Sequence, residues 1–159
     1  MFVQKVHLAR TLAALTLALT ALPLCAAGSK DFQDSVGAAW IKATKANDLN
    51  ALTALYADDA VAWFPDENEH RGRAAIRESY KNLLDTFTVI DASLTDGHHL
   101  GDANHRTNWG HFSMTLKQKS DGKTITMSGR YTDVQEKRHG KWVYVADHAS
   151  AEPAPKATP

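Results

Sequence analysis

The chain has 159 residues with 18 basic and 18 acidic side chains, so its formal net charge is zero when the histidines are neutral. This length suffices for one domain of ordinary size and is short for two separate cores. A balanced charge excludes the electrostatic profile of a nucleic-acid-binding protein, and we expect no nucleic-acid partner.

Residues 1–27 have the pattern of a secretory signal peptide. Basic residues precede an uncharged apolar run over 11–24, which at about 14 residues is too short to span a bilayer, since a span takes about 20. Small residues follow the run, so we expect cleavage after Ala27. The mature chain, residues 28–159, should then be periplasmic or secreted, with no membrane association.

Cysteine usage limits the chemistry of the mature chain. The only cysteine, Cys25, lies within the predicted signal, so neither a disulfide scaffold nor thiol catalysis is expected after cleavage. The alternative, a lipoprotein acylated at Cys25, is disfavoured by the bulky Leu24 before it.

Three helices are predicted in the first half of the mature chain. Apolar residues at three- and four-residue spacing predict a helix over 31–45, Asp48 is positioned to cap a short second helix, and a third helix should run from Gly72 to about Thr86. Between the second and third we expect a turn at 57–59, a short strand over 60–64 and a polar loop over 66–71.

The second half is predicted to be mainly strand. Strands are expected over 88–94 and 104–117, with turns at 96–97 and 101–102, and residues 123–150 should form two long strands joined at Arg138-His139-Gly140. The proline-rich tail over 152–159 is expected to be disordered. Helices followed by antiparallel strands predict one α+β domain over 28–151, in which the helices cover one face of a curved sheet and leave a pocket.

Two acids stand among apolar neighbours on the last two predicted strands. Strand alternation places Asp133 on one face with Met127 and Tyr131, and Asp147 on one face with Val145. Burying a carboxylate is costly unless it is paired or lines a wet cavity. On a shared cavity wall, mutual repulsion would raise one pKa and create an acid/base pair. The alternative is a structural role, with each acid bonded to backbone, to a basic neighbour or to a tyrosine.

His111 is the candidate partner of Asp133, because a histidine titrates near neutrality and its strand should face the last hairpin. The alternative is a half-buried histidine satisfied by a strand neighbour. Several aromatic residues surround the expected cone and suit a ligand pocket with a few directed donors. The candidate ligand-binding residues are Trp40, Phe64, Tyr80, Trp109, Tyr131 and Asp147.

No metal site and no cofactor are expected. His98 and His99 are adjacent on a predicted strand piece and point to opposite faces, and no HxH or HExxH spacing is present. A homodimer is expected, because alternation predicts a semi-apolar face that the helices leave uncovered. This face consists of Trp142, Tyr144, Ala146 and His148.

Several strings resemble the nuclear transport factor 2-like superfamily, the cone-shaped α+β fold of ketosteroid isomerases and SnoaL-like polyketide cyclases. They are ANDLNALTALYADDAVAWFP and RGRAAIRESY. The ending GRYTDVQEKRHGKWVYVADHAS is similar to small bacterial proteins related to the association domain of calcium/calmodulin-dependent protein kinase II. The resemblance covers essentially all of residues 31–150.

The resemblance implies particular site residues. The buried acid of ketosteroid isomerases falls on Asp133, their helix tyrosine on Trp40 and their proton-transferring base on Phe64. Phenylalanine cannot abstract a proton, so steroid isomerisation by that route is not expected. The carboxylate-holding arginines of the kinase-association relatives fall on Asp133, Ala149 and about His111, none of which is arginine.

Two functions therefore remain open. One is an exported enzyme that uses acid/base chemistry, with Asp133 and His111 as catalytic residues, on a small apolar or aromatic molecule. The other is a non-catalytic, dimeric ligand-binding module. A purely oligomer-forming role is a weaker third interpretation.

Overall fold

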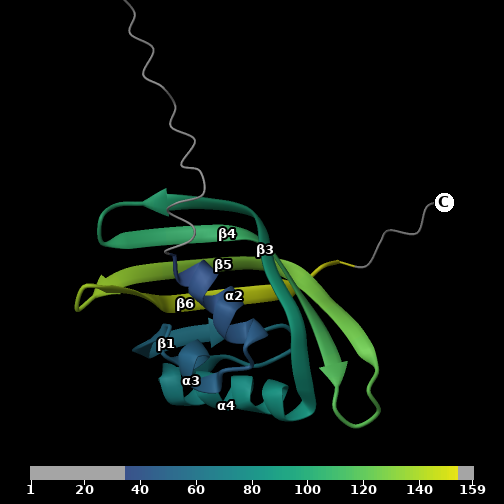
Figure 1. Cartoon of the computed structure of the whole chain (residues 1–159). Coiled ribbons are helices and arrows are strands. Elements are labelled where there is room, and N and C mark those ends of the chain that lie inside the picture. The colour runs from purple at the N-terminus through teal and green to yellow at the C-terminus, as the bar shows by residue number, and fades with distance from the viewer. Residues whose placement is uncertain (1–34, 154–159) are drawn as a thin grey trace, which may run out of the picture.

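The structure is a computed structural model that describes residues 35–153 (Figure 1). The predicted signal peptide and the last six residues lie outside the described residues. The described elements are α2 (Val36–Lys45), α3 (Leu49–Thr53), β1 (Tyr56–Trp63), β2 (His70–Arg71), α4 (Gly72–Thr86), β3 (Phe87–Gly101), β4 (His105–Gln118), β5 (Thr124–Arg138) and β6 (Lys141–Ala151).

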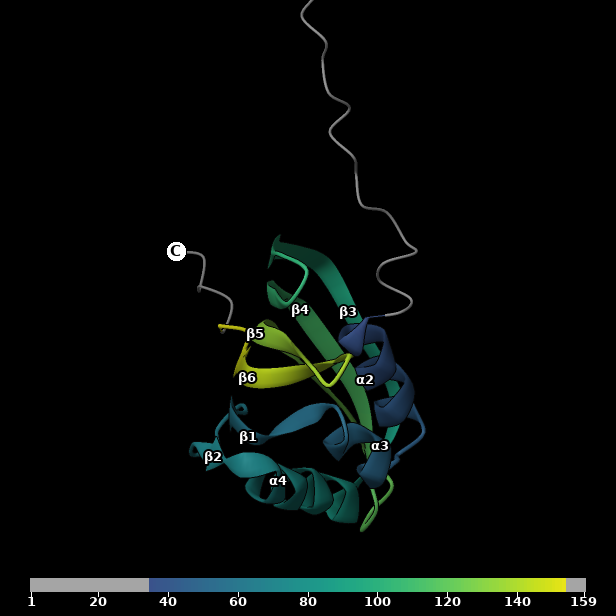
Figure 2. The ribbon, with the colours of Figure 1, turned by 90° about the vertical axis from the view of Figure 1, so that its left-hand side faces the viewer.

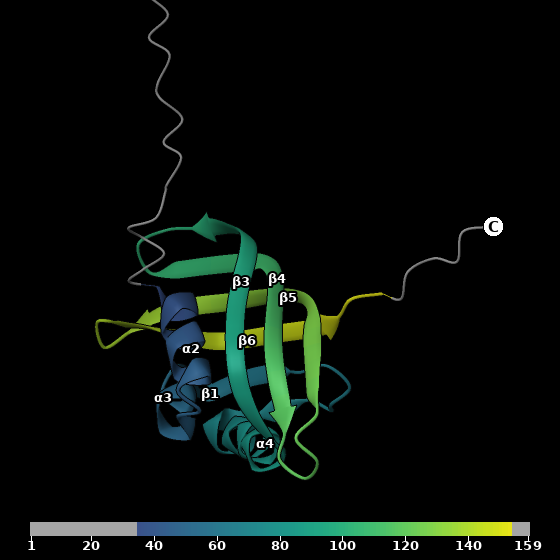
Figure 3. The same cartoon turned by 45° about the vertical axis from the view of Figure 1, so that its right-hand side comes forward.

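The strands form one six-stranded sheet in the order β2-β1-β6-β5-β4-β3. All neighbours are antiparallel except β1 and β6, which pair in parallel. The long strands β3, β4 and β5 bend along their length (Figure 3), and the helices lie on the concave side of the sheet (Figure 2). The predicted α+β class and the curved sheet with helices on one side are confirmed.

Two hydrophobic clusters pack between the helices and the sheet. One joins the helices to β1 and β6 around Tyr56 and Ile76, and the other lies on β3 and β4 around Phe112 and Leu116. Trp40 from α2 packs against both clusters, together with two leucines of α4. These helix residues therefore join the two clusters into one core and contact the sheet on β1, β6, β3 and β4.

The first helix ends at Lys45 as predicted, while the part of its predicted start over 31–34 lies outside the described residues. The Ser35 side chain accepts a hydrogen bond from the Ala38 N–H at 3.1 Å and starts α2. The Asp48 carboxylate accepts one from the Ala51 N–H at 2.9 Å and starts α3, as predicted. The third helix has its predicted limits, Gly72 and Thr86.

The predicted turn at 57–59 is wrong, because these residues belong to β1. The two acids of this segment point outward and pair with cations: Asp58 lies 2.7 Å from Arg73, and Asp59 binds Arg138. The small apolar residues of β1 point inward and are buried. The acidic dipeptide Asp58-Asp59 is thus an exposed part of a strand, where the sequence suggested a turn.

The predicted break of the third sheet strand is also wrong. β3 continues from Phe87 to Gly101, and the register shift between Thr95 and His98 absorbs Asp96 and Gly97 as a bulge. Asp96 has a φ of 51°, which explains its turn-like character in the sequence.

The last hairpin forms as predicted, but its second strand contains a bulge. His139 and Gly140 both have positive φ, 51° and 78°, as a two-residue turn requires. Further along, Val134 pairs with Ala146 whereas Gln135 pairs with Tyr144, so Val145 has no partner in the ladder. Alternation reverses at Val145, and Tyr144 is buried in the core. The predicted outer position of Tyr144 is therefore wrong.

Asn47 ties the turn after α2 to the free edge of β3. Its Nδ2 donates to the Val89 carbonyl at 3.0 Å, and the Val89 N–H donates to its Oδ1 at 2.7 Å. Asn47 adopts a φ of 55°, which presents the amide in this orientation. One side chain thus satisfies both backbone groups of a buried residue on an edge strand.

We expect Asn47→Gly to lower the free energy of unfolding by about 1–3 kcal/mol, because Val89 loses both partners while glycine keeps the positive φ accessible. Urea unfolding measures the change. Asn50→Ala, on the exposed side of α3, serves as the control and should change stability by less than about 0.5 kcal/mol. An equal, small effect for both variants would contradict the bridging role.

Candidate functional site

A cavity of about 100 Å³ lies between the helices and the concave face of the sheet. Its walls are apolar and aromatic, with carboxylates at two places and no lysine, arginine or histidine among the described lining residues. The lining residues are Trp40, Phe64, Pro65, Glu67, Ser79, Tyr80, Leu83, Leu94, Phe112, Met114, Met127, Tyr131, Asp133, Tyr144, Asp147 and Ala149.

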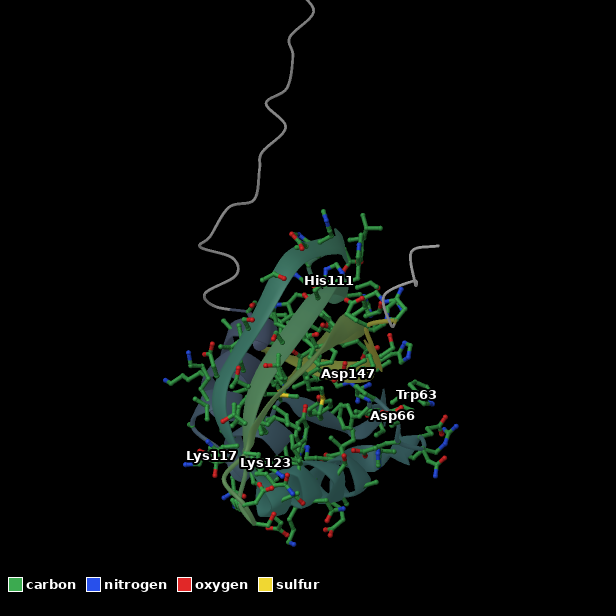
Figure 4. The ribbon with its side chains drawn as sticks, turned by 90° about the vertical axis from the view of Figure 1, so that its right-hand side faces the viewer. Trp63, Asp66, His111, Lys117, Lys123 and Asp147 are labelled. Carbon is green, nitrogen blue, oxygen red and sulfur yellow. The ribbon has the colours of Figure 1, made fainter. Side chains whose placement is uncertain are left out.

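Asp133 and Asp147 are direct register partners on β5 and β6. Directly opposite residues on one face have Cβ atoms about 4.5–5.5 Å apart, and both side chains line the cavity. In Figure 4 Asp147 lies toward the centre of the molecule. The shared wall that the hairpin register predicted is therefore present.

Asp133 is held by two side-chain amides. Asn108 Nδ2 donates to Oδ1 at 2.6 Å, and Gln135 Nε2 donates to the same oxygen at 2.8 Å. Burial raises the pKa of Asp133 to about 7; the amide hydrogen bonds oppose this shift, and the charge of Asp147 adds to it. Because both donors use Oδ1, Oδ2 is the oxygen that can carry a proton. Oδ2 accepts no hydrogen bond from a described residue and keeps some accessible surface. Since Asp133 lines the cavity, we infer that Oδ2 faces it.

Asp147 ends a chain of hydrogen bonds that begins on α2. Trp40 Nε1 donates to the Tyr80 hydroxyl at 3.0 Å, the Tyr80 and Tyr56 hydroxyls lie 2.8 Å apart, and Tyr56 donates to Asp147 Oδ2 at 2.6 Å. An indole can only donate, and Tyr56 uses its single proton on Asp147, so Tyr80 donates to Tyr56. Burial raises the pKa of Asp147 to about 6, although the Tyr56 bond opposes the shift.

Two other tyrosines keep their hydroxyls available. Tyr144 is 4% exposed and Tyr131 is half-buried, and no described residue hydrogen-bonds either hydroxyl. The Tyr144 hydroxyl oxygen also keeps some accessible surface, and Tyr144 lines the cavity, so we infer that this hydroxyl faces the cavity. Burial, followed by the charge of Asp133, raises the pKa of both hydroxyls, so both remain protonated near neutral pH.

The SnoaL-like domain family matches residues 38–145. The chain belongs to the SnoaL-like family. The sequence resemblance to this group and to the nuclear transport factor 2-like fold is thereby confirmed. No curated protein sequence matches this SnoaL-like chain.

Solved structures show the same fold. A Xanthomonas campestris protein, whose name assigns it to the calcium/calmodulin dependent protein kinase II association domains, is 26% identical, with a TM-score of 0.71 over 83% of this chain and 94% of that one. A nuclear transport factor 2-like superfamily protein from Salmonella enterica is 19% identical, with a TM-score of 0.70 over 80% and 92%. A ketosteroid isomerase-like protein from Erwinia carotovora is 17% identical, with a TM-score of 0.65 over 80% and 100%.

The rim of the SnoaL-like cavity carries a third carboxylate. Glu67 Oε2 accepts a hydrogen bond from the Ser79 hydroxyl at 2.6 Å and lies 2.7 Å from His70 Nε2. Phe64 lies beside this group, with its ring 5.2 Å from the Tyr80 ring. The residue at the expected base position is thus part of the apolar wall, and the nearest acid on this side is at the mouth.

The predicted cavity positions of Trp109 and His111 are wrong. β4 turns Phe112 and Met114 into the cavity, so strand alternation sends the odd-numbered residues to the outer face. Trp109 stacks on His98 there, with ring centroids 5.8 Å apart. His111 lies 3.5 Å from Asp96 and 3.6 Å from Glu152, at the upper end of the sheet in Figure 4. The predicted pairing of His111 with Asp133 does not form.

The other six predicted site residues do line the cavity: Trp40, Phe64, Tyr80, Tyr131, Asp133 and Asp147. Sequence reasoning missed Asn108 and Gln135, which bind Asp133, and Tyr56, which binds Asp147. A usable signal existed for Asn108, because it shares an alternation face with Phe112 and Met114. Among residues 35–153 no three metal-binding side chains form a metal site, and no helix is long and apolar enough to cross a membrane.

The raised pKa of Asp133 predicts a pH dependence of stability. In the folded protein the Asp133 carboxyl stays protonated up to about pH 7, whereas its ordinary pKa is 3.8. Between these pH values the folded state therefore binds more protons than the unfolded state. Its stabilising contribution is full below about pH 4 and is lost as the pH rises through 7. Asp147, with a pKa of about 6, acts in the same direction.

We therefore expect Asp133→Asn to melt at a higher temperature than the wild type at pH 8, and to exceed it by a smaller margin at pH 5. The asparagine oxygen still accepts the Asn108 and Gln135 bonds, while the buried charge is gone. Calorimetry at both pH values measures the difference. Asp91→Asn, an exposed acid whose pKa is lowered by Lys45, is the matched control. A wild-type advantage at pH 8 would contradict the expectation.

Proposed function

We propose that this SnoaL-like domain binds a small apolar or aromatic molecule in its cavity and catalyses proton transfer on it, with Asp133 as the acid/base group. The observation that supports this most strongly is the pair of facing carboxylates on an otherwise apolar wall. A carboxyl whose pKa lies near 7 gives and takes a proton readily at neutral pH.

The proposed reaction uses the free polar atoms of the cavity. Asp133 Oδ2 takes a proton from a carbon next to a carbonyl, and the Tyr144 and Tyr131 hydroxyls donate to the carbonyl oxygen as negative charge develops there. The proton on Oδ2 then returns to a different carbon or to the same one. Asp147 keeps its charge through Tyr56 and helps hold the Asp133 pKa near neutrality.

The cavity size limits the substrate. An engineered apolar cavity of about 150 Å³ binds one benzene molecule, and the cavity here measures about 100 Å³. We therefore propose a substrate with at most one ring. This size limit argues against a steroid, and so does Phe64, which stands where a steroid isomerase would have its acid.

We expect the mature protein, residues 28–159, to accelerate the exchange of the α-hydrogens of cyclohexanone for deuterium in D₂O at pD 7–8. Asp133→Asn should lower this rate by about 10²–10⁴-fold, the usual contribution of a general acid or base. Tyr144→Phe should lower it less, because it removes one donor. Proton NMR of the ketone measures the rate, and Asp91→Asn is the control that should retain it.

The alternative function is a non-catalytic binding module. Two observations support it. The polar groups of Trp40, Tyr80 and Tyr56 find their hydrogen-bond partners within the protein, and His111 points outward, away from the cavity. An exchange rate that is the same for the wild type and Asp133→Asn would contradict catalysis and favour this module.

We also propose that the protein is exported and forms a homodimer through the outer face of the sheet. One row of register partners crosses five strands on this face, and its two tryptophans are 36% and 38% exposed. The row consists of Trp63, His148, Thr132, Trp109 and His98. It replaces the predicted face that included Tyr144.

We expect sedimentation equilibrium to give a dimer at high micromolar concentration. Trp109→Glu should shift the protein to a monomer, because the charge would be buried in the contact. Ile125→Glu is the control, since Ile125 is a similarly exposed residue outside the row. A monomeric wild type would contradict the proposal.

A further inference from the structure

The cavity combines aromatic walls with acids and lacks a basic residue. Six aromatic side chains contribute to it: Trp40, Phe64, Tyr80, Phe112, Tyr131 and Tyr144. Asp133 and Asp147 lie on the sheet wall and Glu67 lies at the rim, and no described lysine, arginine or histidine lines the cavity. Every formal charge on its wall is therefore negative.

The two carboxylates of the sheet wall, Asp133 and Asp147, have no hydrogen-bonded cation among the described residues, whereas Glu67 at the rim lies 2.7 Å from His70 Nε2. The groups that bind Asp133 and Asp147 are amides and a tyrosine hydroxyl, which are neutral. The cation nearest Asp133 in sequence, Arg130, is exposed and pairs in register with the outward His111. Two further arginines are used elsewhere: Arg73 binds Asp58 and the Tyr56 carbonyl, and Arg106 lies 4.4 Å over the Trp142 ring. His148 is exposed on the opposite face from Asp147. A carboxylate on a low-dielectric wall without a cation is costly.

Aromatic rings supply a second attraction for a cation. The negative face of a tyrosine, tryptophan or phenylalanine ring attracts an ammonium group, and this attraction strengthens when the site is dry. The two methionines of the wall add polarizable surface. The free oxygens of Asp133 Oδ2, Tyr144 and Tyr131 can accept hydrogen bonds from an ammonium.

We propose that the ligand of this cavity is a small organic cation, a protonated amine on at most one ring, held between the aromatic wall and Asp133. The inference rests on the proposed function only in using the same cavity as the ligand site. The ammonium binds ionised Asp133, the ring packs on the aromatic and methionine side chains, and Glu67 attracts the cation at the mouth. An anionic molecule of the same shape is repelled by all three acids.

Three probes with the same ring test the charge preference at pH 8: benzylamine, benzyl alcohol and benzoate. The described methionines, Met114 and Met127, both line the cavity, so ¹³C-methyl methionine NMR reports binding at this site. We expect benzylamine to bind at least tenfold more tightly than benzyl alcohol, and benzoate to bind most weakly. Equal or tighter binding of the alcohol or of benzoate, or no binding of benzylamine at millimolar concentration, would overturn the proposal.

Variants and pH identify the carboxylate. Asp133→Asn should reduce the preference for benzylamine over benzyl alcohol to less than threefold, and Glu67→Gln should weaken benzylamine alone. Glu78→Gln, an exposed acid of α4 outside the cavity, is the matched control and should change nothing. If Asp133→Asn does not fold, the wild type still decides, because benzylamine affinity should fall about tenfold from pH 8 to pH 5 while that of benzyl alcohol stays constant.

The binding experiment and the exchange experiment can contradict the two proposals separately. Amine binding without ketone exchange would support the cation site and contradict proton transfer. Ketone exchange with no charge preference among the probes would support the proposed function and contradict the cation site.

Discussion

Two like charges side by side on the concave face are the constraint on which this structure depends. The fold must place Asp133 and Asp147 opposite each other on β5 and β6 and still satisfy both. It does so with neutral donors from four other positions: Asn108, Gln135, Tyr56 and, behind Tyr56, Tyr80. The helices that carry Trp40 and Tyr80 cover the sheet and also complete this bonding, so stability and site chemistry share the same residues.

Much of this arrangement could be read from the sequence, because it depends on local periodicity. The helix limits, the tight turn at Gly140 and the shared face of Asp133 and Tyr131 all follow from spacing over a few residues. The facing of Asp133 and Asp147 followed from the hairpin register. The family resemblance added the cone and its pocket.

The errors arose where one residue changes the phase of a strand. Val145 has no ladder partner, and this single bulge moves Tyr144 from the outer face into the cavity wall. On β4 either the odd-numbered residues, such as His111, or the even-numbered ones, such as Phe112, can face inward. Packing against residues of α2 and α4 places the even-numbered ones inside. Two-residue alternation contains no information about which face the helices will cover.

The chain from Trp40 to Asp147 has a direction that depends on one proton. When Asp147 is ionised, every hydroxyl proton in it points toward the carboxylate, and none is left over. A proton on Asp147 Oδ1, which binds no described residue, leaves the chain unchanged. A proton on Oδ2 reverses it: Oδ2 donates to Tyr56, Tyr56 donates to Tyr80, and Tyr80 accepts from both Tyr56 and Trp40. The Tyr80 proton then has no place in the chain and turns toward the cavity that Tyr80 lines. The position of one proton on a β6 carboxyl, on Oδ2 or away from it, thereby controls whether Tyr80 on the helix side offers a donor to the cavity.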